Sequence, residues 1–182
     1  MTPTPDPNQR DLELVRLFQA GDEGAFDRLV GIHRRDIYRL AYRLLGNHAD
    51  ADDMAQEAFL RIYRSLGRFR GEASFRTWST RIVLNLVTDR RREQASHRAH
   101  SLEELRPAEH PFEAGKQEGF IYEEVLRRAV GRLPKRQRET LILRIFQEMK
   151  FHEIAVVMGC TVGTAKANFF HALRGLKQKV GN

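Results

Sequence analysis

The chain has 182 residues with a formal net charge of +7; 41% of them are hydrophobic and 30% are charged. This composition supports a folded core and excludes a wholly disordered chain, and the positive charge favours a polyanionic partner. The single cysteine excludes a disulfide framework, and no stretch approaches the roughly 20 apolar residues of a membrane span, so we expect a cytoplasmic protein without membrane insertion.

The first half of the sequence predicts one helical domain over residues 9–93. Residues 1–8 are rich in proline and predict a disordered tail. Apolar residues at helical spacing predict helices over residues 9–20, 22–45, 49–66 and 75–92. In the first of these, Leu12, Val15 and Leu17 are expected to face the core. Glycines at positions 21, 46 and 67 are expected to end the first three helices.

The second half predicts another helical domain after a linker. Residues 94–118 hold two prolines and no sustained apolar period, which predicts a flexible segment. Helical spacing resumes at Phe120, and Pro134 is typical of a helix start. The predicted fold is all-α, with two small helical domains joined by the linker, and the second domain covers residues 119–182.

Residues 151–174 predict a helix-turn-helix within this second domain. Ile154, Ala155 and Met158 form the inner face of its first helix, Gly159 provides a left-handed cap and Thr161 caps the next helix. Cys160, in the turn, is interpreted as a small buried residue without a redox role. The residues of the second helix expected to face inward are Val162, Ala165, Phe169, Ala172, Leu173 and Leu176.

The outer face of this second helix is suited to the DNA major groove. Residues 162–182 carry four lysines and arginines and no acidic residue. Cationic side chains attract phosphates, while neighbouring side chains can contact base edges. The alternative is a solvated basic face on a helix-turn-helix that never contacts DNA.

Two clusters in the first domain indicate binding surfaces. Asp50, Asp52, Asp53 and Glu57 open the third helix, where the helix dipole stabilises one or two carboxylates. Four carboxylates suggest instead a docking surface for a basic protein partner. Residues 61–92 carry nine arginines and two acids, interleaved with aromatics, which is typical of surfaces that stack unpaired bases.

A polar stripe follows along the fourth predicted helix. Its members lie three or four residues apart and share one face: Trp78, Arg81, Asn85, Thr88 and Arg92. The Asn85 amide offers both a donor and an acceptor and is a candidate contact to a base, although it could instead cap a loop within the domain.

No catalytic or metal-binding constellation is apparent. The seven histidines are scattered, and no glycine-rich nucleotide motif occurs. We therefore expect no enzymatic activity, no metal and no cofactor. A helix-turn-helix repressor or activator with a helical sensor domain, or an enzyme with a DNA-binding tail, remain alternative classes at this point.

Residues 11–180 resemble the extracytoplasmic-function (ECF) family of bacterial RNA polymerase sigma factors. The resemblance rests on three ordered segments, of which the middle one is the most specific: DEGAFDRLV, DADDMAQEAFLRIYRSLGRFRGEASFRTWSTRIVLNLVTDRRR and LPKRQRETLILRIFQEMKFHEIAVVMGCTVGTAKA. It implies a protein, monomeric when free, that directs core RNA polymerase to promoter DNA and is held by a cognate anti-sigma factor.

The resemblance also implies residue roles. It assigns core-polymerase binding to Asp50, Asp52, Asp53, Gln56, Glu57 and Leu60. It assigns capture of the melted minus-ten element to Arg70, Phe75, Arg76, Trp78, Arg81, Asn85 and Arg92. It assigns contact with the minus-thirty-five element to Thr164, Lys166, Ala167, Asn168, Phe170, His171 and Arg174. Ala167, Asn168 and His171 depart from the residues usual in the family, so the promoter sequence cannot be transferred from relatives.

Overall fold

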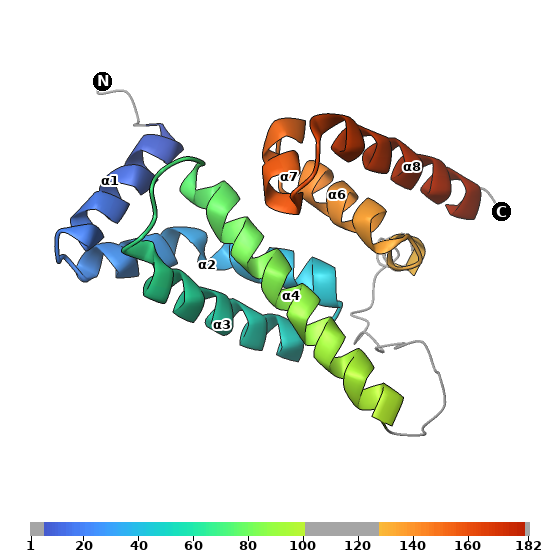
Figure 1. Ribbon diagram of the computed structural model, residues 1–182, viewed down its shortest axis with the longest axis horizontal. Helices are drawn as coiled ribbons and strands as arrows, with labels where there is room; N and C mark the ends of the chain where they lie inside the picture. The colour runs from blue at the N-terminus through green and yellow to red at the C-terminus, as the bar shows by residue number, and fades with distance from the viewer. Residues whose placement is uncertain (1–5, 101–127, 181–182) are drawn as a thin grey trace, which may run out of the picture. The chain divides into compact units, whose positions relative to one another are not determined.

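The computed structural model describes residues 6–100 and 128–180, and every regular element in these two ranges is a helix (Figure 1). The predicted all-α fold is confirmed for this part of the chain. The chain divides into two compact units, Met1–Arg106 and Pro107–Asn182.

The first unit contains four helices that surround one core. They are α1 (Pro7–Gln19), α2 (Gly24–Leu45), α3 (His48–Leu66) and α4 (Phe75–His100). Each helix packs against the other three, and α2 makes the most extensive contact, with α3. The residues that fill this core include Leu29, Leu40, Ile62, Leu66, Val83 and Val87.

The local signals that end and start these helices have clear physical causes. Gly46 ends α2, as predicted, and adopts a left-handed conformation there. Asn47 caps α3 by accepting a hydrogen bond from the Asp50 amide at 2.8 Å. Ser74 caps α4, since its hydroxyl accepts a hydrogen bond from the Thr77 amide at 3.1 Å. The Ser74 cap was not among the sequence-based predictions.

Three predictions for the first unit are wrong. The predicted disordered tail, residues 1–8, overlaps α1, which begins at Pro7 and is capped by the Asp6 carboxylate. Leu17 is 38% exposed, and the buried face of α1 is formed by Asp11, Leu14 and Val15 instead. The prediction of a linker from residue 94 is also wrong at its start, because α4 continues to His100. No proline or glycine lies between residues 75 and 100 to interrupt it. The rest of the predicted linker, 101–118, lies outside the described residues.

The second unit is built on the helix-turn-helix. Residues 128–131 are helical, followed by α6 (Lys135–Ile145), α7 (Phe151–Met158) and α8 (Val162–Val180). Helix α8 packs against both α6 and α7. Leu133, Leu141 and Ala172 are buried at the contact of α6 with α8. Pro134 directly precedes α6, as its predicted role in starting a helix requires.

Candidate nucleic-acid and protein interfaces

The polar stripe on α4 lies on the outer side of the first unit. Arg81, Asn85 and Arg92 are exposed, and Trp78 and Thr88 are half-buried at the edge of this face. On the opposite side of the helix, Val83 and Val87 are fully buried. The spacing of three and four residues therefore predicted one outward face correctly.

Asn85 has the freedom that a base contact requires. Its amide makes no hydrogen bond to any other residue in the described part of the chain, whereas the neighbouring Thr88 hydroxyl donates to the Leu84 carbonyl at 2.8 Å. Asn85 does not cap a loop, which was the structural alternative. Its donor and acceptor are both available to a ligand.

Phe75 does not belong to this exposed face. It is fully buried at the first position of α4 and contacts the rings of His33, Phe69 and Trp78, at centroid distances of 4.9, 6.4 and 5.8 Å. A ring with no exposed surface cannot stack on a base, so the structure does not place Phe75 among the contact residues. Arg70 and Arg76, which flank it, are exposed.

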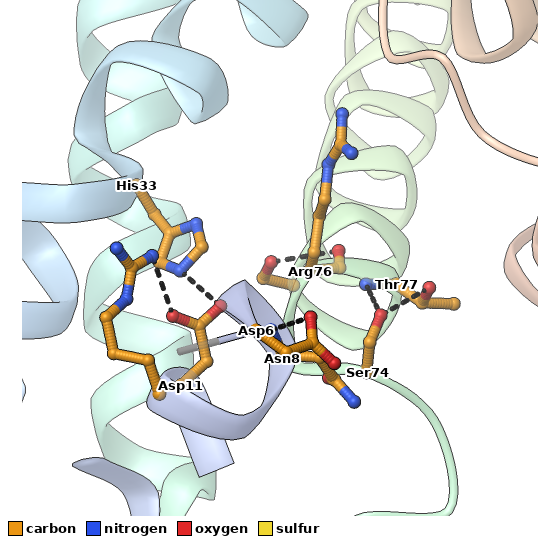
Figure 2. Close-up of polar contacts among 9 residues, drawn as sticks. Asp6, Asn8, Asp11, His33, Ser74, Arg76 and Thr77 are labelled. Carbon is orange, nitrogen blue, oxygen red and sulfur yellow. Dashed lines mark hydrogen bonds and ion pairs between the residues drawn. The ribbon is translucent and has the colours of Figure 1, made fainter. Parts of the chain in front are cut away.

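The segment between α3 and α4, residues 67–74, is referred to below as the arginine loop. Arg68 and Arg70 are exposed on it, and Phe69 is half-buried. Its ends are held by side chains that the sequence analysis did not single out. Gln19 donates to the Leu66 and Phe69 carbonyls at 3.1 and 3.0 Å, and the Ser74 hydroxyl donates to that of Thr77 at 2.8 Å (the latter in Figure 2).

The acidic cluster on α3 is divided between internal and outward roles. Asp50 is half-buried and pairs with Arg90 at 2.9 Å, and its carboxylate also accepts a hydrogen bond from Asn47 at 2.7 Å. Asp52, by contrast, is exposed. The Asp53 side chain is 65% exposed and lies at the outer limit of an ion pair with Arg90, at 3.9 Å.

The outward residues of α3 form a continuous surface. Gln56 is exposed one turn beyond Asp52 and Asp53, and Leu60 is 51% exposed one turn further. Glu57 borders this surface and pairs with Arg61 at 3.3 Å. An apolar residue with carboxylates on its N-terminal side fits a partner that presents basic and apolar side chains together. Asp50 was also predicted to bind the partner, but its carboxylate is engaged within the unit by Arg90 and Asn47.

Aromatic rings adjoin the acidic end of this surface. Tyr38 and Tyr42 stack near His48, with the Tyr42 and His48 rings 4.6 Å apart. Desolvation of the Tyr38 ring, and secondarily the Asp52 carboxylate, raise the pKa of the Tyr38 phenol. The phenol therefore stays protonated at neutral pH, and its hydroxyl hydrogen-bonds with His48 Nδ1.

The helix-turn-helix has the turn that its sequence predicts. Gly159 adopts φ 59° and ψ 48°, a left-handed conformation that favours glycine. The Thr161 hydroxyl accepts a hydrogen bond from the Thr164 amide at 3.0 Å and so caps α8. Ile154, Ala155 and Met158 are buried as expected. Cys160 is half-buried rather than buried.

The outer face of α8 carries most of the residues assigned to the upstream promoter element. Thr164, Lys166, Ala167, Phe170, His171 and Arg174 are exposed, and Asn168 is half-buried. Phe170 is 70% exposed, the largest value among the exposed large hydrophobic residues. Two residues expected to face inward do not: Val162 and Leu173 are 40% and 42% exposed. Among the side chains of α8 whose burial the structure describes, only Ala165 and Ala172 are fully buried, because small side chains let α6 and α7 approach closely.

Within the residues that the structure describes, no group of three or more His, Cys, Asp or Glu side chains could hold a metal ion. No helix in the same ranges combines the length and the apolar character needed to cross a membrane.

Comparisons with known proteins agree on both units. A family model for sigma-70 region 2 matches residues 29–97, and one for sigma-70 region 4 matches residues 123–176. The chain is 34% identical to the RNA polymerase sigma-H factor of Pseudomonas aeruginosa over 179 residues, covering 90% of each chain. It is also 34% identical to the ECF RNA polymerase sigma-E factor of Escherichia coli, covering 93% of this chain and 94% of that one.

Solved structures support the same fold. CnrH in complex with the cytosolic domain of CnrY matches with a TM-score of 0.72 at 22% identity, over 94% of this chain and 97% of the other. The sigma factor RpoE of Bartonella quintana, in complex with the anti-sigma factor NepR, matches with a TM-score of 0.71 at 20% identity, over 86% and 96% of the two chains.

Proposed function

The chain belongs to the ECF family of RNA polymerase sigma factors, and from that premise we propose how its surfaces divide the work of transcription initiation. The first unit binds core polymerase through α3 and captures the melted minus-ten element through α4 and the arginine loop. The observation that carries the proposal is the outward face of α4, where Arg81 and Arg92 flank an asparagine amide that bonds to no other described residue.

The two surfaces of the first unit suit opposite kinds of partner. The α3 surface offers Asp52, Asp53 and Leu60 to a basic, partly apolar protein surface. The α4 face offers Arg81 and Arg92 to phosphates and Asn85 to a base. A factor with both surfaces can hold the polymerase and the opened strand at once.

The second unit supplies the upstream contact through α8. Lys166 and Arg174 neutralise phosphates, and Phe170 is suited to apolar contact with a thymine methyl group. Ala167 and His171 lie at positions where relatives usually carry hydroxyl or cationic residues. This chain therefore selects an upstream element whose sequence differs from those that its relatives select.

The factor has no catalytic activity of its own, since the polymerase catalyses transcription. It acts in the cytoplasm, together with the polymerase. Two of the matched structures are complexes with a second protein, one of them described as an anti-sigma factor, and we propose that a protein of that kind controls this chain too. The free protein is expected to be monomeric.

Reconstitution with core polymerase tests this function. A library of promoter-length duplexes with random upstream and downstream elements would be transcribed by core polymerase with and without the protein. We expect transcripts from a narrow set of sequences only when the protein is present. Duplex binding without transcription would instead favour a helix-turn-helix repressor or activator, the main alternative.

Asn85→Ala should impair promoter opening more than core binding. Losing a base-contacting amide costs about 1–3 kcal/mol of discrimination at one position of the minus-ten element. Permanganate footprinting on duplex and premelted promoters measures opening, and a pull-down measures core binding. Glu93→Ala, an exposed change on the same helix, serves as the control. A mutant that melts early but keeps its base preference would make Asn85 a structural residue.

Lys166→Ala and His171→Ala should reduce promoter use in a way that depends on the upstream element. If Lys166 contacts a phosphate, its loss weakens all sequences alike and lowers the salt slope by about one. If it contacts a base, preference relaxes at one position. Lys150→Ala removes the same charge outside α8 and should change neither quantity. An unaltered upstream profile in both mutants would exclude α8 as the recognition helix.

A further inference from the structure

Helix α1 contacts the arginine loop through two side chains, one near its middle and one at its C-terminal end. At its C-terminal end, the Gln19 side-chain amide donates to two carbonyls, those of Leu66 and Phe69, at 3.1 and 3.0 Å. These carbonyls belong to the end of α3 and to the loop, 47 and 50 residues away along the chain. One side chain thus joins α1 to the point where the loop begins.

A second contact lies in the middle of the loop. Gly71 has a φ of 73°, which favours glycine, and a Cβ placed there would lie 3.7 Å from Leu12 Cδ2. The half-buried Leu12 side chain of α1 therefore lies against the loop backbone at its turn.

A third contact is indirect and reaches the end of the loop. Asp11 of α1 and His33 of α2 are 4% and 7% exposed, and their side chains are joined at 2.8 Å between Oδ2 and Nε2 (Figure 2). A hydrogen bond between two such groups keeps the histidine ring in one orientation. That ring contacts Phe75, the first residue after the loop and its cap, at 4.9 Å.

The loop needs these contacts because its own backbone supplies little restraint. Backbone hydrogen bonds hold its first residues, from Arg68 to the Ser65 carbonyl and from Phe69 to the Leu66 carbonyl. Over residues 70–73, the backbone makes no hydrogen bond to another described backbone group. Side chains from outside the loop therefore determine where Arg70 and its neighbours lie.

We propose that α1 is a brace that positions the arginine loop for capture of the unpaired promoter strand, with Gln19, Leu12 and the Asp11–His33 pair as its positioning residues. The inference rests on the proposed function of the loop. The region 2 family model begins at residue 29, so that match assigns no part to α1. The brace touches no DNA, and it acts through the position of Arg70 and Trp78.

Trp78 provides a direct measure of loop position. It is the only tryptophan in the chain, it is half-buried, and its ring lies 5.0 Å from that of Phe69, whose carbonyl accepts the Gln19 hydrogen bond. Movement of Phe69 changes the surroundings of the indole, so emission and acrylamide quenching of the free protein report the loop without polymerase or DNA.

Gln19→Glu is the test substitution, because a carboxylate cannot donate and faces two carbonyl oxygens. Gln19 is exposed, so the change leaves the core intact. Glu13→Gln, an exposed change on the same helix, is the matched control. We expect a shift to longer wavelength and stronger quenching of Trp78 in Gln19→Glu, and wild-type emission in the control. Leu12→Ala, which removes the contact at Gly71, should act in the same direction.

The functional arm uses the promoter selected by the wild-type holoenzyme, with its minus-ten element premelted. Capture of this probe by the Gln19→Glu holoenzyme should be about tenfold weaker, as expected for two lost hydrogen bonds, while core binding stays unchanged. Unchanged Trp78 emission, unchanged capture, or an equal loss of core binding would each overturn the brace. Failure of the wild-type protein to transcribe would count against the proposed function alone, since the Trp78 measurement does not depend on it.

Discussion

Replacing Phe75 with alanine should destabilise the first unit by about 3–5 kcal/mol, the cost of truncating a buried aromatic ring that leaves a cavity. Phe75 has no exposed surface and lies among His33, Phe69 and Trp78, so the space it leaves cannot be refilled from solvent. Urea unfolding followed by Trp78 fluorescence reports this unit specifically, because the second unit contains no tryptophan.

Arg70→Ala is the control for stability, since Arg70 is exposed and its loss should change the free energy of unfolding by less than about 0.5 kcal/mol. The base preference at the minus-ten element should distinguish the two variants in the opposite way: Arg70→Ala should alter it and Phe75→Ala should not. At a temperature where it is still folded, Phe75→Ala should keep the wild-type preference at the minus-ten element. A folded Phe75→Ala protein that changes which base is preferred, and not only how tightly the element is captured, would return Phe75 to the set of DNA contacts.

The second large effect is expected from reversing charge on α3. Asp53→Lys with Glu57→Lys should weaken core-polymerase binding by about 2–5 kcal/mol, because like charges then meet across a partly desolvated interface. The fold should survive, since both side chains are well exposed, at 65% and 44%, and their apolar neighbours Met54 and Ala58 remain buried. Pull-down with core polymerase at several salt concentrations measures the loss.

A matched double variant distinguishes an effect of the α3 site from an effect of the change in net charge. Glu13→Lys with Asp36→Lys produces the same change in net charge from exposed positions on α1 and α2. It should bind core polymerase nearly as the wild type does. Equal weakening in both double variants would reduce the α3 cluster to ordinary stabilisation of a helix N-terminus. Asp50 is left unchanged in these variants because its pairing with Arg90 is internal.

Much of the architecture follows from local sequence. Gly46 was predicted to end its helix and Gly159 to do so in a left-handed conformation. Both end a helix in that conformation, because the backbone of glycine tolerates it at little cost. The periodicity that placed Arg81, Asn85 and Arg92 on one face depends only on the helical repeat within α4. Such features need no knowledge of distant segments.

The sequence-based predictions were wrong where the helical spacing of apolar residues was used to infer which side chains are buried. Val162 and Leu173 have apolar side chains at helical spacing, yet both are exposed, because α6 and α7 cover only part of α8 and these residues lie at its edges. Leu17 of α1 is exposed for a similar reason, while the charged Asp11 is buried. Hydropathy alone would have placed these two residues the other way round.

By itself, the sequence determined the helical class, most helix ends, the turn of the helix-turn-helix and the outward stripe of α4, because each is set within a few consecutive residues. The tertiary structure decided which side chains of α1 hold the arginine loop, that Phe75 is enclosed and that Asp50 is occupied by Arg90. These contacts join residues separated by tens of positions along the chain. No local period encodes them, since they depend on which helix surfaces meet once the core has formed.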